Sequence, residues 1–475
     1  MTGMRIISRH LPTRSLIFLL IWAIPAAGTP QELADGPSAI RPSELERHLQ
    51  FLGNDDLEGR GAGSRGEKLA ASYISRELAR NRILPAGDGG TYLQAVPMHG
   101  STPLPDSECR LITPDDTLDL ALWSQYVLIK SGAQTFVPNP VPLVFVGYGI
   151  VAPEFDYNDY QALDVEDKIV VFLPGEPRSD DPAYFSGEDP TVYSYPESKV
   201  RMAISRGARG SILLPGENGK EWDEWTRQYA FEDVNLAYTI TGHLSLVVDP
   251  QSAALLFAGA AHDLERIYQM ERQSHLHSCP LRTSLSFKGK FRERDFLGHN
   301  VLGCLEGADP ELKKSCLILS AHYDHLGIGP PVRGDSIYNG VFDNAAGVAA
   351  LLEIAAALSR LDPPPARSVL FIFLTGEEKG LLGSTYYLDH PAFPLYRTIA
   401  NINVDGLAMF DTFNDAVGIG AEYSTLGETL SEVSAELGLA VSPIPSPSCT
   451  QRRLRGRTRS LLPRRAFPPC SSWRD

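Results

Sequence analysis

The chain of 475 residues has few cysteines, and none of them forms a C-x-x-C pair. The six thiols are scattered at Cys109, Cys279, Cys304, Cys316, Cys449 and Cys470. Scattered thiols of this kind give no disulfide pairing that can be deduced from sequence. Cys304 and Cys316 lie in apolar, strand-like stretches, which favours buried thiols over metal ligands.

Positive charge is also scarce, with 43 Lys and Arg against 58 Asp and Glu and a net charge of −15. Residues 449–475 carry eight Arg against one Asp, which leaves −22 on residues 1–448. Nucleic-acid binding needs Lys/Arg-dense surfaces that displace counterions, so an acidic body excludes this class of partner. An apolar share of 43% and a charged share of 21% are typical of a soluble globular protein with room for two or three domains.

Long apolar runs are absent after the N-terminal segment, and no later segment is apolar enough to predict a membrane span. Arg5, Arg9 and Arg14 precede an apolar run at 16–27 that ends in small residues. This run has the length of a signal-peptide core and is too short to span a bilayer. We therefore expect residues 1–28 to be a signal peptide and the protein to be secreted or periplasmic. An uncleaved anchor is the alternative.

Two amphipathic helices are predicted after this segment. In "PSELERHLQFL" (42–52), Ser43 and Glu46 have the spacing of a capping box, and in "GSRGEKLAASYISREL" (63–78) Ser64 and Glu67 repeat it. The glycine-rich stretch "NDDLEGRGAGS" (54–64) connects them.

The rest of the chain falls into stretches that differ in their predicted secondary structure. Residues 105–288 hold short β-rich runs between Pro/Gly turns, which predicts an inserted β-rich module. Residues 289–448 alternate apolar strands with helices, the pattern of an α/β fold with a mostly parallel mixed sheet and helices on both faces. Residues 29–104 are interpreted as the N-terminal part of the same domain, and 449–475 as an aberrant basic tail.

Acids and histidines follow the predicted strands or open a helix in this last region. They are His322, Asp324 and His325 in one motif, Asp343 in a second, Glu377 and Glu378 in a third and Asp405 in a fourth. Open α/β sheets place ligands at the carboxyl ends of their strands. Several carboxylates converging on one imidazole would repel one another unless cations neutralised them. Imidazole with carboxylate favours zinc, and Asp343 could bridge two ions about 3.5–4 Å apart.

Four motifs, "AHYDHLG" (321–327), "GVFDNAAG" (340–347), "TGEE" (375–378) and "NVDG" (403–406), resemble those of the zinc aminopeptidase family that includes aminopeptidase Y and glutamate carboxypeptidase relatives. The resemblance spans roughly residues 40–445. It implies a zinc-exopeptidase fold, and it identifies the insert at 105–288 as similar to a protease-associated domain.

The resemblance also implies site roles. His322 and Asp405 would bind one zinc, Glu378 the other, and Asp343 would bridge the two. Glu377 would act as general base, and Asp324 would orient His322. A cis peptide bond between Asp343 and Asn344 is implied as well.

One expected ligand is missing. The family supplies a late histidine to the second zinc, but no histidine follows His390 here. We interpret residues from about 449 as out of frame, with a genuine basic tail as the alternative. The second zinc site is then incomplete, and impaired activity is expected. His325 is interpreted as a hydrogen-bonded loop residue, with substrate contact as the alternative, and His299 and His390 as structural residues.

The sequence thus predicts an exported zinc aminopeptidase that acts on peptide substrates. One alternative is a non-catalytic binding protein on the same scaffold. Another is a different reaction at a similar site, such as glutaminyl cyclisation or carboxypeptidase action.

Overall fold

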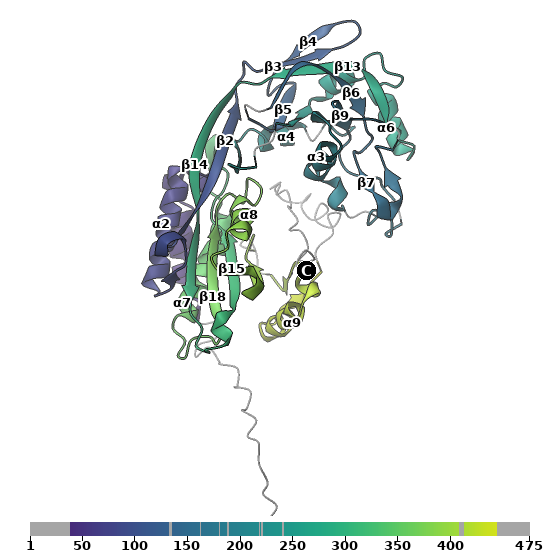
Figure 1. Cartoon of the computed structure of the whole chain (residues 1–475). Helices are drawn as coiled ribbons and strands as arrows, with labels where there is room; N and C mark the ends of the chain where they lie inside the picture. Colours follow the sequence, from purple (N-terminus) through teal and green to yellow (C-terminus); the bar gives the residue numbers. More distant parts are fainter. Residues whose placement is uncertain are drawn as a thin grey trace, which may run out of the picture.

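Two large β-sheets organise the protein (Figure 1), one of seven strands and one of eight. The structure is a computed structural model. It describes residues 39–443 apart from 133–134, 162, 180, 188–189, 218, 220–221, 240–241 and 408–412. The predicted signal peptide and the predicted out-of-frame tail both lie outside the described residues.

The seven-stranded sheet holds the strands of the four motifs. Its order is β11-β2-β14-β18-β15-β19, with β1 paired to β14. The strands are β1 (Leu84–Pro85), β2 (Leu93–Pro103), β11 (Asp233–Leu236), β14 (Phe291–Leu305), β15 (Cys316–His322), β18 (Ser368–Leu374) and β19 (Thr398–Asn403). The predicted mixed α/β sheet is confirmed, but its mostly parallel character is wrong, because four of the six strand pairings described are antiparallel. Among the described strands of this sheet, parallel pairing is confined to β15 with β18 and with β19. These are the strands joined through helices, and parallel neighbours need such crossovers.

Helices cover both faces of this sheet, as predicted. On one face lie α1 (Pro42–Leu52), α2 (Arg65–Arg80) and α7 (Ala346–Leu358), and on the other lies α8 (Leu382–Asp389) (Figure 1). The first face buries an apolar cluster that includes Ile74, Leu351 and Phe371. The second face buries Cys316 and Ile372 against Tyr387 of α8. Because successive strand residues point to opposite faces, continuous apolar runs such as 368–374 serve both clusters.

One of the two predicted helix caps is confirmed. Ser64 precedes α2, and its Oγ accepts a hydrogen bond from the backbone N–H of Glu67 at 3.1 Å. The prediction for Ser43 is wrong, because α1 already begins at Pro42 and its N-cap is Arg41, which makes no side-chain cap bond. Proline favours the first helical position, since its ring fixes φ at a helical value and its missing N–H needs no partner there.

The second sheet lies between residues 108 and 288. Its order is β4-β3-β13-β6-β9-β10-β12-β5. The strands are β3 (Glu108–Ile112), β4 (Thr117–Leu120), β5 (Tyr126–Lys130), β6 (Phe136–Phe145), β9 (Ile169–Phe172), β10 (Gly210–Leu213), β12 (Leu244–Val248) and β13 (Cys279–Lys288). The helices in this part are α3 (Pro196–Ser205), α4 (Trp222–Gln228), α5 (Pro250–Leu256) and α6 (Leu264–Arg272). The assignment of this segment to a protease-associated domain, and its boundaries, stay predictions.

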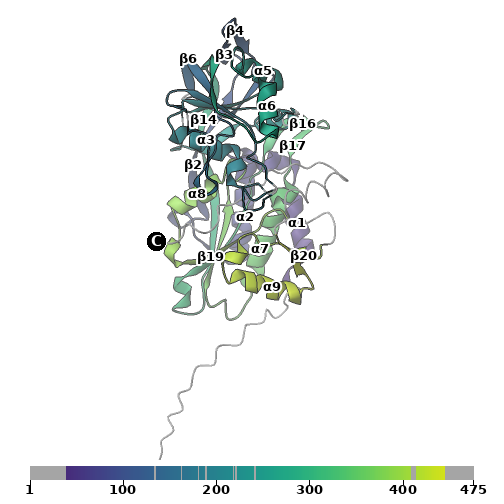
Figure 2. The same cartoon turned by 90° about the vertical axis from the view of Figure 1, so that its right-hand side faces the viewer.

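A long ribbon joins the two sheets. Strands β2 and β14 pair in register from Leu93 opposite Val301 to Pro103 opposite Phe291, and they run from the first sheet toward the second (Figures 1 and 2). The short strand β11 comes from the segment between them in sequence and pairs with the outer side of β2. The second sheet is therefore held to the first by three strands.

The remaining elements are short. They are β7 (Val151–Ala152), β8 (Tyr157–Asn158), β16 (Gly327–Val332), β17 (Asp335–Tyr338), β20 (Asp415–Ala416), β21 (Ala440–Val441) and α9 (Leu426–Glu436). Within the described residues, one helical stretch, Val341–Leu358, is long and apolar enough to cross a membrane, which the sequence did not predict. Because 67% of that stretch is buried inside the protein, it is a core helix by packing.

Candidate metal centre

The motif residues gather at one rim of the first sheet. His322 is the last residue of β15, Glu377 and Glu378 follow β18, and Asp405 follows β19. These three strands are parallel neighbours, so their carboxyl ends meet at the same rim. Asp343 lies in the turn at Val341–Ala345 that leads into α7. The peptide bond between Asp343 and Asn344 is cis, which confirms that expectation.

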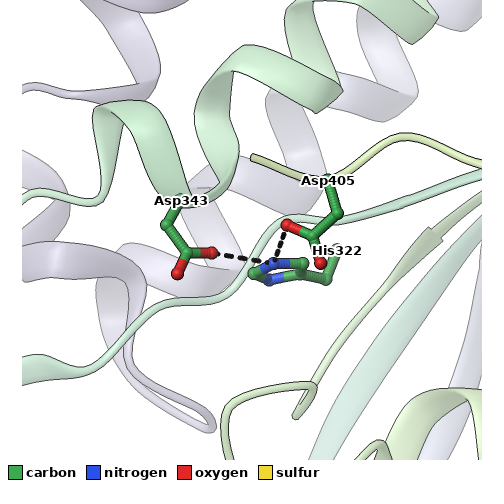
Figure 3. A group of neighbouring side chains, drawn as sticks. All are labelled: His322, Asp343 and Asp405. Carbon is green, nitrogen blue, oxygen red and sulfur yellow. Dashed lines mark ion pairs between the residues drawn. The ribbon is translucent and has the colours of Figure 1, made fainter. Parts of the chain in front are cut away.

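The first donor group consists of His322, Asp343 and Asp405. Figure 3 shows both carboxylates directed at the imidazole, with Nε2 of His322 lying 3.0 Å from Oδ1 of Asp343 and 3.4 Å from Oδ1 of Asp405. The imidazole is buried, with 1% of its side chain exposed. On the far side of the ring, Nδ1 lies 3.2 Å from the backbone carbonyl of Asp324 and 3.7 Å from its carboxylate. The contact within hydrogen-bond distance therefore comes from the Asp324 backbone.

This first group has the character of a cation site. Nε2 of His322 and Oδ2 of Asp324 are both buried without a hydrogen-bond partner. Two carboxylates held against one buried imidazole nitrogen repel each other, and a positive charge between them, on the ring or on a bound cation, offsets that repulsion. Burial lowers the pKa of His322, but the carboxylates of Asp324, Asp343 and Asp405 outweigh it and hold that pKa well above its usual value. A divalent cation would supply the same positive charge, so the residues present fit a metal.

A second donor group contains a residue that the sequence did not assign to the metal. It consists of His325, Asp343 and Glu378, whose donor atoms lie within 4.8 Å of one another. Nδ1 of His325 lies 2.6 Å from Oε1 of Glu378. Asp343 belongs to both groups, as expected of a bridging carboxylate. The only signal in the sequence was that His325 stands within "AHYDHLG".

Glu377 lies beside both groups and belongs to neither. Its backbone N–H donates to Oδ1 of Asp324 at 3.1 Å, which fixes the turn after β18. Burial raises the pKa of Glu377 to about 7. The charge of His322 works against this rise, while the negative charges of Asp324, Glu378 and Asp405 add to it. A carboxyl group that titrates near neutral pH is suited to proton transfer.

Arg60 supports the loops of the site from inside the protein, a role that the sequence did not predict. Its side chain is fully buried between the connection after α1 and the loops of the site. The guanidinium donates to the carbonyls of Tyr323 at 2.7 Å, Asn339 at 2.6 Å and Gly340 at 2.8 Å, and to that of Leu52. Burial lowers the pKa of Arg60 to about 10, so it stays charged at neutral pH. One side chain thus ties β15 to the loop before Asp343.

Glu67 forms a second buried support. Instead of returning to Ser64, its carboxylate accepts a hydrogen bond from the backbone N–H of Gly63 at 2.6 Å and one from the hydroxyl of Thr375. The hydroxyl of Tyr323 lies 3.4 Å away. Burial raises the pKa of Glu67 from 4.5 to about 7, despite the hydrogen bonds that lower it.

This raised pKa predicts a pH dependence of stability. The folded protein holds the Glu67 proton up to about pH 7, while the unfolded chain releases it near pH 4.5. The contribution of Glu67 to the unfolding free energy is therefore fully present below pH 4.5 and is lost as the pH rises through 7. The side chain introduced by Glu67→Gln is neutral at every pH. The unfolding free energy of this variant, relative to that of the wild type, should therefore rise by about 3 kcal/mol between pH 4.5 and 8. Urea unfolding across that range measures the gain, and Glu46→Gln, on the exposed face of α1, is the control. A gain that is constant with pH would contradict the prediction.

Comparisons with known proteins relate this part of the chain to one family of peptidases. The sequence pattern of Peptidase family M28 matches residues 300–454, which include every donor of both groups. Residues 300–454 of this chain are therefore similar to an M28 peptidase domain.

Curated relatives match a smaller part of the chain than its full length. Leupeptin-inactivating enzyme 1 of Streptomyces exfoliatus is 30% identical over 143 residues, which cover 30% of this chain and 29% of that enzyme. The probable leucine aminopeptidase 2 of Aspergillus oryzae is 36% identical over 92 residues, 19% of this chain and 16% of its own. The matched part spans less than a third of these relatives. Among solved structures, an aminopeptidase from Aneurinibacillus sp. strain AM-1 is 18% identical and covers 86% of both chains, with a TM-score of 0.46.

Proposed function

We propose that this protein is a zinc-dependent aminopeptidase that hydrolyses the N-terminal peptide bond of peptides. The observation that carries the proposal is the buried Nε2 of His322, which has no hydrogen-bond partner and faces the carboxylates of Asp343 and Asp405, within a segment similar to the M28 family. Imidazole and carboxylate oxygens are a donor set that zinc prefers.

Different residues of this chain would have different roles in the proposed reaction. His322, Asp343 and Asp405 would hold one ion, and Asp343 with Glu378 would contribute to a second. When bound, zinc supplies Lewis-acid chemistry that polarises a carbonyl and lowers the pKa of water. Glu377, with its pKa near neutrality, is positioned to accept a proton from the attacking water and to return it to the leaving amine. Asp324 fixes the turn that carries Glu377 and the ring that carries Nε2.

Export and substrate access are part of the proposal. The basic and apolar N-terminal segment supports secretion or transport to the periplasm. The second sheet would restrict access to the site, in line with its predicted relation to a protease-associated domain. Retention of Glu377 with all four motif ligands favours an enzyme over the alternative of a non-catalytic binding protein.

An aminoacyl-anilide assay on the full chain tests this function. Activity is expected with added zinc, none after chelation, and recovery when zinc is restored. N-acetylated substrates should not be cleaved, because an aminopeptidase needs the free amine. Cleavage of C-terminal residues, or cyclisation of N-terminal glutamine, would instead support one of the alternative reactions. A chain that binds no zinc and cleaves none of these substrates contradicts the proposal.

A further inference from the structure

We infer that His325 completes the second cation site of this chain, so that a zinc-class divalent ion there is held by His325, Asp343 and Glu378. This inference rests on the proposed function and deepens it. It replaces the two-donor second site that the sequence alone implied, in which the second ion had only Asp343 and Glu378.

The donor positions carry the inference. Nδ1 of His325, an oxygen of Asp343 and an oxygen of Glu378 lie within 4.8 Å of one another, the same criterion that the first group meets. Because Asp343 belongs to both groups, two ions bound here would share it. Two-metal hydrolases use such a shared carboxylate for ions about 3.5–4 Å apart. Each ion would then have three protein donors, one of them an imidazole.

His325 is held in this position by its surroundings. Its backbone N–H donates to the carbonyl of Arg60 at 3.3 Å, and 13% of its side chain is exposed. The ring packs against Gly340, where a Cβ would come within 2.5 Å of Cγ of His325. Gly340 also has a φ of +59°, a conformation that favours glycine. The loop before Asp343 therefore leaves room for this imidazole.

The charge of the rim favours a histidine as the third donor. Asp324, Asp343, Glu377, Glu378 and Asp405 all lie at this rim. A third carboxylate around the second ion would add repulsion, whereas a neutral imidazole adds a ligand without charge. Among the described residues, His325 is the histidine whose ring meets Glu378.

The rival role for His325 is to orient Glu378 through the 2.6 Å hydrogen bond without binding metal. Two substitutions separate the roles. His325→Ala removes the imidazole and the hydrogen bond. His325→Asn keeps an N–H donor close to the position of Nδ1 but removes the imidazole ligand. His390→Asn, at the end of α8, is the matched control, since His390 belongs to neither donor group.

Zinc stoichiometry by equilibrium dialysis and elemental analysis of the full chain decides the question, with cobalt(II) absorption as a second readout. We expect two ions in the wild type and in His390→Asn. In both His325 variants we expect one tight ion and a second weakened at least tenfold. Circular dichroism checks that the variants are folded, and the retained first ion reports an intact rim.

Three results would overturn the inference. They are a wild type that binds a single ion, a His325→Ala variant that binds two as tightly as the wild type, and a His325→Asn variant that restores the second ion. Each of these leaves the proposed peptidase intact, because the first site is unaffected. Binding of no ion by the wild type would remove the proposed function as well.

Discussion

Replacing Glu377 with Gln is expected to lower kcat on an aminoacyl-anilide by about 10²–10⁴-fold, the usual contribution of a general acid–base group. The amide has nearly the same shape as the carboxylate but cannot accept the proton of the attacking water. Since Glu377 belongs to neither donor group, the zinc content should not change. Kinetics and metal analysis on one preparation measure both quantities.

Glu311→Gln provides the control for this substitution. Glu311 is exposed, pairs with Lys314 on the surface and lies outside both donor groups. Its activity should match the wild type. If Glu377→Gln kept full activity with full zinc content, Glu377 would not be the base. If it lost zinc together with activity, its role would be that of a ligand.

Replacing Arg60 with Ala is expected to cost at least about 3 kcal/mol of unfolding free energy, because each buried carbonyl left without a donor costs about 1–3 kcal/mol. Three of the four carbonyls that Arg60 contacts belong to the residue after β15 and to the loop before Asp343, at Tyr323, Asn339 and Gly340. We therefore expect weaker zinc binding as well as a lower midpoint of thermal unfolding.

Two further variants make the Arg60 result specific. Arg65→Ala removes an exposed guanidinium at the start of α2 and should change stability by less than about 0.5 kcal/mol. Arg60→Lys keeps the charge but lacks the planar fork of donors, so it should recover only part of the loss. An Arg60→Ala protein as stable as the Arg65→Ala protein would show that the carbonyls find other partners.

The strands and the rim could be predicted from sequence because they depend on local pattern. Apolar runs that end in acids or a histidine fix both the strand and the side of the sheet where these residues emerge, so His322, Glu378 and Asp405 could be placed at one rim before any coordinates. Arg60 could not be assigned in this way, because three of its four carbonyl partners lie more than 260 positions away in the chain. The contact of His325 with Glu378 depends on how the loop after β15 turns past Gly340. Glu67 has the spacing of a capping-box residue, but its carboxylate is buried and accepts hydrogen bonds from Gly63 and Thr375 instead of from Ser64.

The pairing of β11 with β2 sets a limit on treating the second sheet as a detachable module. Excising residues 105–288 would also remove the outermost strand of the seven-stranded sheet and leave the edge of β2 open to intermolecular association. The same excision would take away Phe231, whose ring faces Lys379 next to Glu378, and Glu232, the ion-pair partner of Arg294. Transplanting this accessory sheet onto a relative, or trimming it for biotechnology, would therefore also change the lining of the pocket to which Phe231, Glu232, Arg294 and Lys379 belong.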